Sequence, residues 1–381
     1  MRVLTKDRAP ERIQVNLNKS INDVKLPGGR GILGFGQDNN YPELIENLIS
    51  SSVTGVSVFR ILSKFLTGEG LENNSLNEIK VGRDLNGNKI TVRKFISQVA
   101  DQIAKFNGVY IHVNRNLEGH VTRLKVINFP KCRLSKQDDL GYSSKVVTST
   151  DWSNYKKSVN NVYELYQSLN SDWTKDVEDI TKHKGQLYYM FLNNTYNYPL
   201  STFDSVALDL ATENEISEFR YNEAANGFTV KTIIVVPEPE TTEAGEEIKD
   251  RIESMTGGEG ERVLVMTGDV DENGDVKEKG GIVIKEVKSS IDDKTFETWD
   301  SLMSNRIRKA AYALPAVLID YEESKLGTIS GEGITQAVNF YNSQTTDLRS
   351  EISDILKTLL GNFDNEDLRN NDNWAIRKLV L

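Results

Sequence analysis

The sequence predicts an α+β fold in which a small α/β block is set between two long helices. Apolar residues recur at helical spacing over 202–225 and 292–313, and the stretch between them has the pattern strand, helix, strand, strand. Residues 41–201 mix helical and alternating patterns, and a further helical pattern covers 333–360. Helices and strands are therefore both abundant, without the regular alternation of a parallel α/β sheet.

The composition limits the class of protein. A chain of 381 residues can form two or three cooperative units, and its single cysteine excludes a disulfide framework and favours a reducing compartment. Nowhere do 18 apolar residues follow one another, and the N-terminus lacks the apolar core of a secretion signal, so we expect neither a membrane span nor secretion. Only 38% of residues are hydrophobic and 27% are charged, which favours elongated parts with much surface.

The charge is unevenly distributed along the chain. The net charge of −10 argues against a protein that grips nucleic acid by its phosphates. Residues 201–226 carry six acidic residues against Arg220, and residues 237–280 carry fourteen against five basic residues. An acidic run is most often a solvated surface, but here the acids are concentrated in one continuous third of the chain.

The N-terminal part predicts an arm followed by helices. Residues 1–40 show no sustained period and predict an extended arm. Helical spacing begins at Pro42 and continues, after an interruption at residues 51–52, to Gly68, which ends the helix. Another helix is predicted over 91–106, with its apolar residues on one face.

Strands and tight turns are predicted on both sides of that second helix. Asn-Gly at residues 86–87 and Glu-Gly at residues 118–119 each lie between alternating runs, which predicts two β-hairpins. Residues 131–185 are ambiguous and predict more strands with one short helix. The run GQLYYMFLNN at 185–194 predicts a buried strand.

The block between the two long helices is predicted to contain three strands and one helix. Strands are expected at 229–238, 261–269 and 280–287, with an acidic helix at 242–255 and an Asn-Gly hairpin turn at 273–274.

Beyond this block, Pro315 ends the helix over 292–313. A glycine-punctuated loop then leads into the pattern at 333–360, which predicts one long helix. The last ten residues, 372–381, are expected to fold back as a terminal strand.

The segment Gly29–Gly34 spells G-x-G-x-x-G. A dinucleotide site needs a strand directly before this motif and a helix directly after it, because the pyrophosphate sits on free N–H groups at a helix N-terminus. Here Pro27 precedes the motif and a helix can begin only at Pro42. We therefore expect a loop, and keep a nucleotide-binding enzyme as the alternative.

The run DVDENGD at 269–275 matches the opening of an EF-hand calcium loop. Its twelfth position, which should be a bidentate Glu, is Gly280, and strands flank it where helices should be. A weak surface calcium site stays open as an alternative to the hairpin turn.

The residues that could carry catalysis form no recognisable pattern. His112, His120 and His183 have no metal-ligand spacing, and Cys132 has no histidine near it in the sequence. We expect no enzyme, no metal and no cofactor.

The order of elements resembles the portal protein of tailed bacteriophages, of the siphophage type. Three stretches carry the resemblance: NNYPELIENLISSSVTGVSVFRILSKFLTGEGL at 39–71, the segment at 198–236, and NRIRKAAYALPAVLI at 305–319. They are similar to the family's first helices, to its first stem helix with the following clip strand, and to its helix before the tunnel loop. The resemblance covers residues 38–361.

The resemblance implies a division of the chain into the parts of a portal subunit. These are an N-terminal arm (1–40), an α+β wing (41–201), stem helix 1 (202–226), a small α/β clip (227–288), stem helix 2 (289–314), a wing return with the tunnel loop (315–332), a long helix toward a short crown (333–361) and a C-terminal tail (362–381).

The family's function is implied in the same way. Portal subunits form a ring, expected to be dodecameric, at one capsid vertex, and double-stranded DNA passes through it non-specifically during packaging and ejection. The implied partners are other copies of the chain, the terminase large subunit, head–tail adaptor proteins, and the major capsid and scaffold proteins. The implied location is the virion, and the host cytoplasm during assembly. Another virion ring or adaptor protein is the alternative within this class.

Three groups of site residues are implied. The tunnel loop facing DNA would hold Glu322, Glu323, Ser324, Lys325, Thr328 and Ser330. The clip surface for terminase or adaptor would hold Glu238, Glu240, Glu246, Glu247, Lys249, Asp250, Asp271 and Glu272. The acidic stem along the channel would hold Glu213, Glu215, Glu218 and Glu223.

Overall fold

The chain forms two compact units, each described here by itself. The computed structural model describes residues 20–21, 31–36, 38–155, 160–166, 184–192, 197–225, 231–236, 263–267, 283–287, 293–319 and 331–380. The first unit comprises Met1–Ala211 and Met303–Leu381, and the second comprises Thr212–Leu302. Both helices and strands occur in each, so the predicted α+β class is confirmed at this level.

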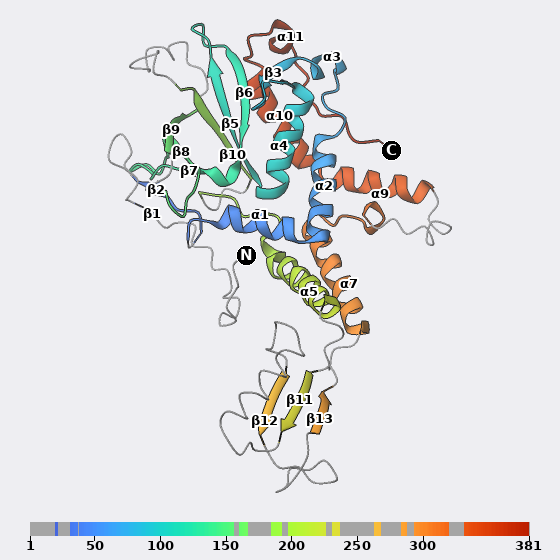
Figure 1. Cartoon of the computed structure of the whole chain (residues 1–381). Coiled ribbons are helices and arrows are strands. Elements are labelled where there is room, and N and C mark those ends of the chain that lie inside the picture. Colours follow the sequence, from blue (N-terminus) through green and yellow to red (C-terminus); the bar gives the residue numbers. More distant parts are fainter. Residues whose placement is uncertain are drawn as a thin grey trace. The chain divides into compact units, whose positions relative to one another are not determined.

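A six-stranded sheet forms one layer of the first unit (Figure 1). Its order is β6-β5-β10-β9-β8-β7, and all neighbours are antiparallel except β9 and β10. The strands are β5 (Gly108–Arg115), β6 (Val121–Ile127), β7 (Cys132–Leu134), β8 (Lys145–Ser149), β9 (Asn160–Leu165) and β10 (Gln186–Phe191). The strand predicted at 185–194 is therefore confirmed as β10, a central strand of this sheet.

Three helices of the N-terminal half pack into the hydrophobic core of the first unit together with the sheet and the C-terminal helices. They are α1 (Tyr41–Ser51), α2 (Val53–Thr67) and α4 (Val92–Phe106), and α4 packs against α2 and against β5 and β6. The Ser52 hydroxyl accepts from the Gly55 N–H at 2.7 Å, which caps α2 and explains why the helical pattern is interrupted there. The helix predicted over 91–106 is confirmed.

Both predicted hairpins of this unit are present. β3 (Lys80–Arg83) pairs with β4 (Lys89–Thr91), and β5 pairs with β6. Gly87 and Gly119 have φ of +82° and +89°, the left-handed region that glycine adopts without strain. A short helix, α3 (Asn74–Asn77), lies between α2 and β3.

The prediction that residues up to 40 form an arm is wrong for the described positions from 31 onward. Ile32 and Phe35 are 0% and 1% exposed, and β2 (Ile32–Leu33) pairs with β1 (Ser20–Ile21). Phe35 stacks on Tyr41 and Tyr198, with ring centroids 5.0 and 4.3 Å away. A segment this short is too brief to show a hydrophobic period. Its burial also depends on Tyr198, which lies far away in the sequence.

The C-terminal helical pattern forms two helices, which corrects the prediction of one long helix at 333–361. α9 (Gly331–Gln344) and α10 (Thr346–Leu360) are separated at Thr345, whose φ and ψ are −99° and 9°. The carbonyl oxygen of Asn342 accepts hydrogen bonds from the Arg349 guanidinium and the Thr346 hydroxyl. These side chains occupy the acceptor that a continuous helix would give to the N–H of residue 346.

The end of the chain folds back, as expected, but through one isolated bridge rather than a full strand. After α11 (Glu366–Arg369), Ile376 bridges Leu71, and the Arg377 N–H donates to the Gly70 carbonyl at 2.8 Å. Gly68 has φ of +53°, and a Cβ built there would lie 2.1 Å from the Arg377 carbonyl oxygen. Only glycine leaves room for the tail at this point.

The helix predicted over 292–313 is shorter than expected. α7 (Asp293–Ala310) ends three residues before the predicted end at 313, because Tyr312 and Ala313 adopt φ of +58° and +53°. These left-handed residues turn the chain ahead of Pro315, which disfavours helical backbone in the residue before it. A 3-10 turn, η5 (Ala316–Leu318), follows.

The second unit contains a three-stranded sheet of order β12-β11-β13, whose strands follow α5 and precede α7 along the chain (Figure 1). Its strands are β11 (Lys231–Val236), β12 (Val263–Thr267) and β13 (Val283–Val287), and α5 (Ala207–Ala225) precedes them after the short η3 (Asp204–Val206). β11 lies between β12 and β13, so these two strands do not pair with each other as the predicted hairpin requires. The predicted turn at 273–274 lies outside the described residues. The β11–β12 pair is parallel, which requires a crossover connection, and the β11–β13 pair is antiparallel.

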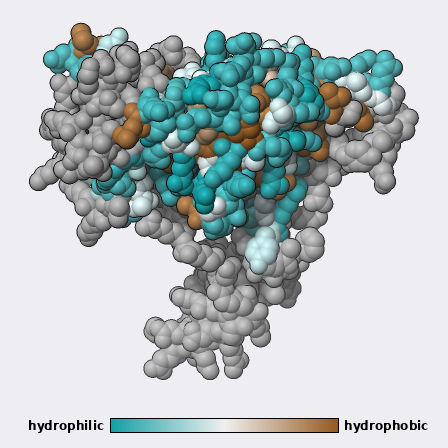
Figure 2. Space-filling view, turned by 90° about the horizontal axis from the view of Figure 1, so that it is seen from above, coloured by the Kyte–Doolittle hydropathy of each residue, from teal (hydrophilic) through white to brown (hydrophobic). Residues whose placement is uncertain are grey.

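The described surface is predominantly polar. On the face shown in Figure 2, hydrophilic residues predominate and apolar ones form small scattered groups. None of the helices in the described part of the chain has the length and apolar character needed to cross a bilayer.

We expect Gly68→Ala to release the C-terminal tail. An alanine Cβ would collide with the Arg377 carbonyl and would also strain the backbone, at a cost of about 1–3 kcal/mol from the strain alone. Gly87→Ala is the matched control, since Gly87 has a similar positive φ but nothing within 4 Å of the added Cβ. Hydrogen exchange of the Arg377 amide should accelerate in the first variant only. Equal protection in both variants would contradict this account.

Candidate functional site

Most residues of the three implied groups lie outside the described residues. This holds for the whole tunnel-loop group, Glu322, Glu323, Ser324, Lys325, Thr328 and Ser330. It also holds for the whole clip group, Glu238, Glu240, Glu246, Glu247, Lys249, Asp250, Asp271 and Glu272. Of the stem group, the structure describes the side chains of three residues.

These three stem acids, all on α5, differ in exposure. Glu215 and Glu218 are exposed, whereas Glu213 is only 8% exposed. Glu223 lies within α5, and its side chain is outside the described part. Among the three described residues of this group, therefore, Glu215 and Glu218 present their carboxylates to solvent in the single chain.

An ion pair joins the first turn of α5 to α7 within the first unit. Arg306 Nε lies 3.3 Å from the Asp209 carboxylate, which is largely buried. Burial raises the pKa of Asp209, and the nearby Arg306 acts in the opposite direction. Phe203, Leu210 and Ile307 are fully buried in the same hydrophobic core. The base of the helix pair is thus fixed by apolar packing and one charged contact.

The side chains considered as candidates for catalysis are His112, His120 and Cys132, and each has a structural environment that accounts for it. His112 Nε2 lies 2.7 Å from the Lys184 carbonyl oxygen, and His120 contacts Asn362 and Arg369. Burial raises the pKa of the Cys132 thiol well above its ordinary value, so this thiol is not a nucleophile at neutral pH. Within the described ranges, no group of three or more His, Cys, Asp or Glu side chains could hold a metal ion. His183 lies outside those ranges.

The glycine motif does not lead directly into a helix. Its described part, residues 31–34, contains the buried strand β2, and α1 begins only at Tyr41. Between β2 and α1 the chain turns at Gly36 and Asn39, whose φ angles are +84° and +58°. The helix N-terminus that would receive a pyrophosphate is therefore separated from the glycines by a turn.

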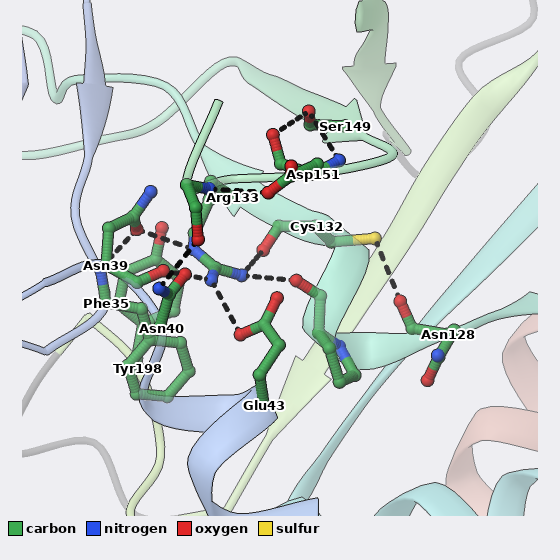
Figure 3. A network of polar contacts seen from close by, with 12 residues as sticks. Phe35, Asn39, Asn40, Glu43, Asn128, Cys132, Arg133, Ser149, Asp151 and Tyr198 are labelled. Carbon is green, nitrogen blue, oxygen red and sulfur yellow. Dashed lines mark hydrogen bonds and ion pairs between the residues drawn. The ribbon is translucent and has the colours of Figure 1, made fainter. Parts of the chain in front are cut away.

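The best-defined polar cluster surrounds Arg133 on β7 (Figure 3). The guanidinium is 0% exposed and donates to the carbonyls of Pro130 and Cys132 at 2.7 and 2.8 Å. It also donates to the carbonyl of Asn39, and its Nε to the Asn39 side-chain oxygen at 2.7 Å. Glu43, in the first turn of α1, lies 3.3 Å from it.

Aromatic rings complete the surroundings of this cation. The Arg133 guanidinium lies over Trp152 at 5.0 Å and over Phe35 at 5.8 Å from the ring centroids. Tyr198 donates its hydroxyl to the Leu33 carbonyl and accepts from the Leu134 N–H, at 2.9 and 2.7 Å. Cation–π contacts of a desolvated guanidinium add to the hydrogen bonds, so the buried charge is compensated on several sides.

Glu43 contributes less to this cluster than its charge suggests. Burial raises the pKa of Glu43, and the Arg133 charge opposes that shift without reversing it. The main acceptors of Arg133 are backbone carbonyls, which do not titrate. The cluster is therefore a structural tie between α1, β7 and the segment before α1.

Sequence reasoning missed Arg133 and a group of basic residues on α2 and α4. Arg133 stands between two buried residues on a strand, where alternation predicts an exposed side chain. Arg60, Lys64 and Arg93 come from two helices and line one hollow. No spacing in the sequence indicates either arrangement, since both depend on how distant segments pack.

We expect Arg133→Met to destabilise the first unit strongly. The variant keeps an apolar side chain of similar length but leaves the buried carbonyls of Asn39, Pro130 and Cys132 without this donor, at a cost of about 3–5 kcal/mol. Glu43→Gln is the control and should cost less than about 1 kcal/mol, since a partly exposed amide oxygen can still accept. Urea unfolding followed by circular dichroism measures both. Equal midpoints for Arg133→Met and the wild type would refute this role.

No protein-family model matches the sequence, and no curated protein matches it. Solved structures are similar in fold. A chain in the neck of an empty gene transfer agent particle, computed with C6 symmetry, has a TM-score of 0.53 at 15% identity, over 89% of this chain and 86% of that chain. A chain in the neck of the native particle, computed with C12 symmetry, has a TM-score of 0.51 at 15% identity, over 85% and 82%.

A crystal structure of an HK97 family phage portal protein from Corynebacterium diphtheriae has a TM-score of 0.44 at 10% identity, over 76% of this chain and 86% of that chain. The two neck chains, at low identity but over most of both lengths, show that this chain has their fold. The resemblance to phage portal proteins predicted from the sequence is confirmed at the level of the fold.

Proposed function

We propose that this chain is a portal subunit that forms a ring of twelve copies at one capsid vertex of a phage or phage-like particle. The observation that carries the proposal is the shared fold with two neck chains over 85% and 89% of this sequence. One of those necks was computed with C12 symmetry, which supports a twelvefold ring here. A role in a particle neck also supports location in the virion.

Exposed apolar side chains on the helices α5 and α7 support a ring. Of the large hydrophobic residues that are exposed in the described part, several lie on these two helices: Leu208, Tyr221, Trp299 and Leu302. Scattered apolar residues on a surface need no partner by themselves, so their place on the two helices is what we assign to subunit contacts. In a closed ring each subunit covers such surfaces with the two subunits beside it.

The division into wing, stem, clip, tunnel loop, crown helix and tail follows from the same proposal. In it the second unit, Thr212–Leu302, contains the clip and the outer parts of both stem helices. The clip would dock the terminase large subunit during packaging and head–tail adaptors afterwards. The tunnel loop, expected over 320–332, would face the DNA, and the capsid and scaffold proteins would surround the ring.

The charge distribution suits a conduit. The acidic residues of 201–226 and 237–280 would form a wall that repels phosphates, so the duplex would slide rather than be held. No catalytic step is part of this function.

The proposal predicts a large ring. The purified chain should have a native mass near twelve times 42.9 kDa, roughly 515 kDa, and should form rings with a central hole in negative-stain images. Native mass spectrometry of the same fraction gives the copy number. A stable monomer or dimer, unchanged by adding scaffold and capsid proteins, would reject the proposal.

The α7 surface gives a sharper version of the test. Leu302→Glu places a charge on an exposed apolar position of the proposed subunit contact and should shift most of the protein from rings to small species. Leu140→Glu introduces the same change on an exposed loop between β7 and β8 and should leave the rings intact. Analytical ultracentrifugation compares them. Rings of equal abundance in both variants would exclude this side of α7 from the contact.

A further inference from the structure

An open hollow of about 370 Å³ lies where α2 packs against α4, the two adjacent helices in Figure 1. Arg60 and Lys64 line it from α2, and Arg93 lines it from α4. Ser63 and Asp101 also line it, and Leu379 of the C-terminal tail closes one side. All of these residues belong to the first unit.

The three cations of this hollow are not neutralised within the described part of the chain. Arg60, Lys64 and Arg93 are exposed, and no ion pair or side-chain hydrogen bond joins them to another described residue. Two nearby lysines differ, since Lys94 pairs with Asp84 at 3.9 Å and Lys105 pairs with Glu46 at 2.9 Å. The structure thus pairs some basic residues of these helices and leaves three open.

The one carboxylate in the hollow already has a donor. Asp101 accepts a hydrogen bond from the Ser63 hydroxyl across the two helices. α2 itself contains no acidic residue, and Asp101 is the only one in α4. In a chain with a net charge of −10, this hollow is therefore a local concentration of positive charge.

The arrangement fits a ligand with regularly spaced phosphates. Arg60 and Lys64 are four residues apart on one helix, so their Cβ atoms are ~6 Å apart. Consecutive phosphates of one DNA strand are ~7 Å apart, since each nucleotide rises ~3.4 Å along the axis and also rotates about it. Arg93, on the neighbouring helix, adds a guanidinium that can hold a phosphate through two parallel N–H groups.

We propose that this hollow binds phosphate groups of duplex DNA through Arg60, Lys64 and Arg93. The inference rests on the proposed function in that a portal ring brings DNA close to every subunit. It adds a contact made by residues of the first unit that belong neither to the acidic helix α5 nor to the proposed tunnel loop. Three contacts without base recognition would attract any duplex and would weaken steeply with salt, because each contact releases condensed counterions.

The test compares two triple variants of the full chain that lose the same charge. Arg60→Gln/Lys64→Gln/Arg93→Gln removes the cations of the hollow. Arg123→Gln/Lys131→Gln/Lys136→Gln, the control, removes three exposed cations from β6, from the 3-10 turn η1 (Phe129–Lys131) and from the segment after β7. Fluorescence anisotropy with a labelled 40-base-pair duplex of arbitrary sequence gives affinity between 50 and 200 mM KCl, and the native mass of each variant is measured alongside.

The hollow variant should bind about tenfold more weakly or worse at 50 mM KCl, and the slope of log affinity against log salt should fall by about 2–3. The control should change the affinity far less and keep the slope. Equal losses in both variants, or no DNA binding by the wild type at 50 mM KCl, would overturn the proposal. So would a hollow variant that binds DNA normally but no longer forms rings, since the hollow would then be a subunit contact.

The two proposals can fail separately. Rings with unchanged DNA binding in the hollow variant would leave the portal function standing and reject the DNA contact. A chain that forms no ring, yet loses DNA binding only in the hollow variant, would reject the portal function and retain the basic hollow.

Discussion

The buried Arg133 guanidinium is the constraint on which the arrangement of the first unit depends. It gathers backbone carbonyls from the turn before α1 and from the start of β7, positions that lie more than ninety residues apart. Those carbonyls are buried and need donors, and a single planar group with five N–H bonds satisfies several of them at once. The entry of the chain into α1 is therefore fixed to the edge of the sheet by one side chain, around which Phe35, Trp152 and Tyr198 pack.

A second buried arginine has a comparable role at the other end of this unit. Arg349 donates to the carbonyl of Asn342 and to that of Phe65 in the last turn of α2. It thereby bends the C-terminal helices at Thr345 and joins them to the helix that also carries Arg60 and Lys64. In both places a charged side chain supplies donors where regular secondary structure ends, which is where backbone groups lack partners.

Local patterns in the sequence are sufficient to predict elements that depend on residues a few positions apart. The spacing of apolar residues predicted α4, and Asn-Gly at 86–87 predicted the β3–β4 hairpin, since period and turn chemistry act over a few residues. Asn-Gly at 273–274 gives the same local signal for a hairpin. The strands on either side of it, β12 and β13, nevertheless do not pair, because β11 lies between them. The burial of Phe35 has no local signal because Tyr198, which stacks on it, lies 163 residues away in the sequence. The break at Thr345 depends on nearby residues, but side-chain hydrogen bonds from Thr346 and Arg349 to the Asn342 carbonyl do not alter the apolar spacing from which a helix is predicted.

The two candidate surfaces, one acidic and one basic, differ in how far the sequence predicts them: the acidic one follows from composition and the basic one from packing. The acidic character of 201–280 is a property of composition, so the sequence alone supports a wall that repels DNA. The basic hollow requires α2 and α4 to be in contact, because Arg60 and Arg93 lie more than thirty residues apart. Both features are compatible with the proposed conduit. With a slope of about 0.9 per phosphate contact, three contacts weaken by about sixfold for each doubling of salt. An attraction from three contacts, which weakens this steeply with salt, can orient a duplex near the proposed ring without preventing its passage through the proposed acidic channel.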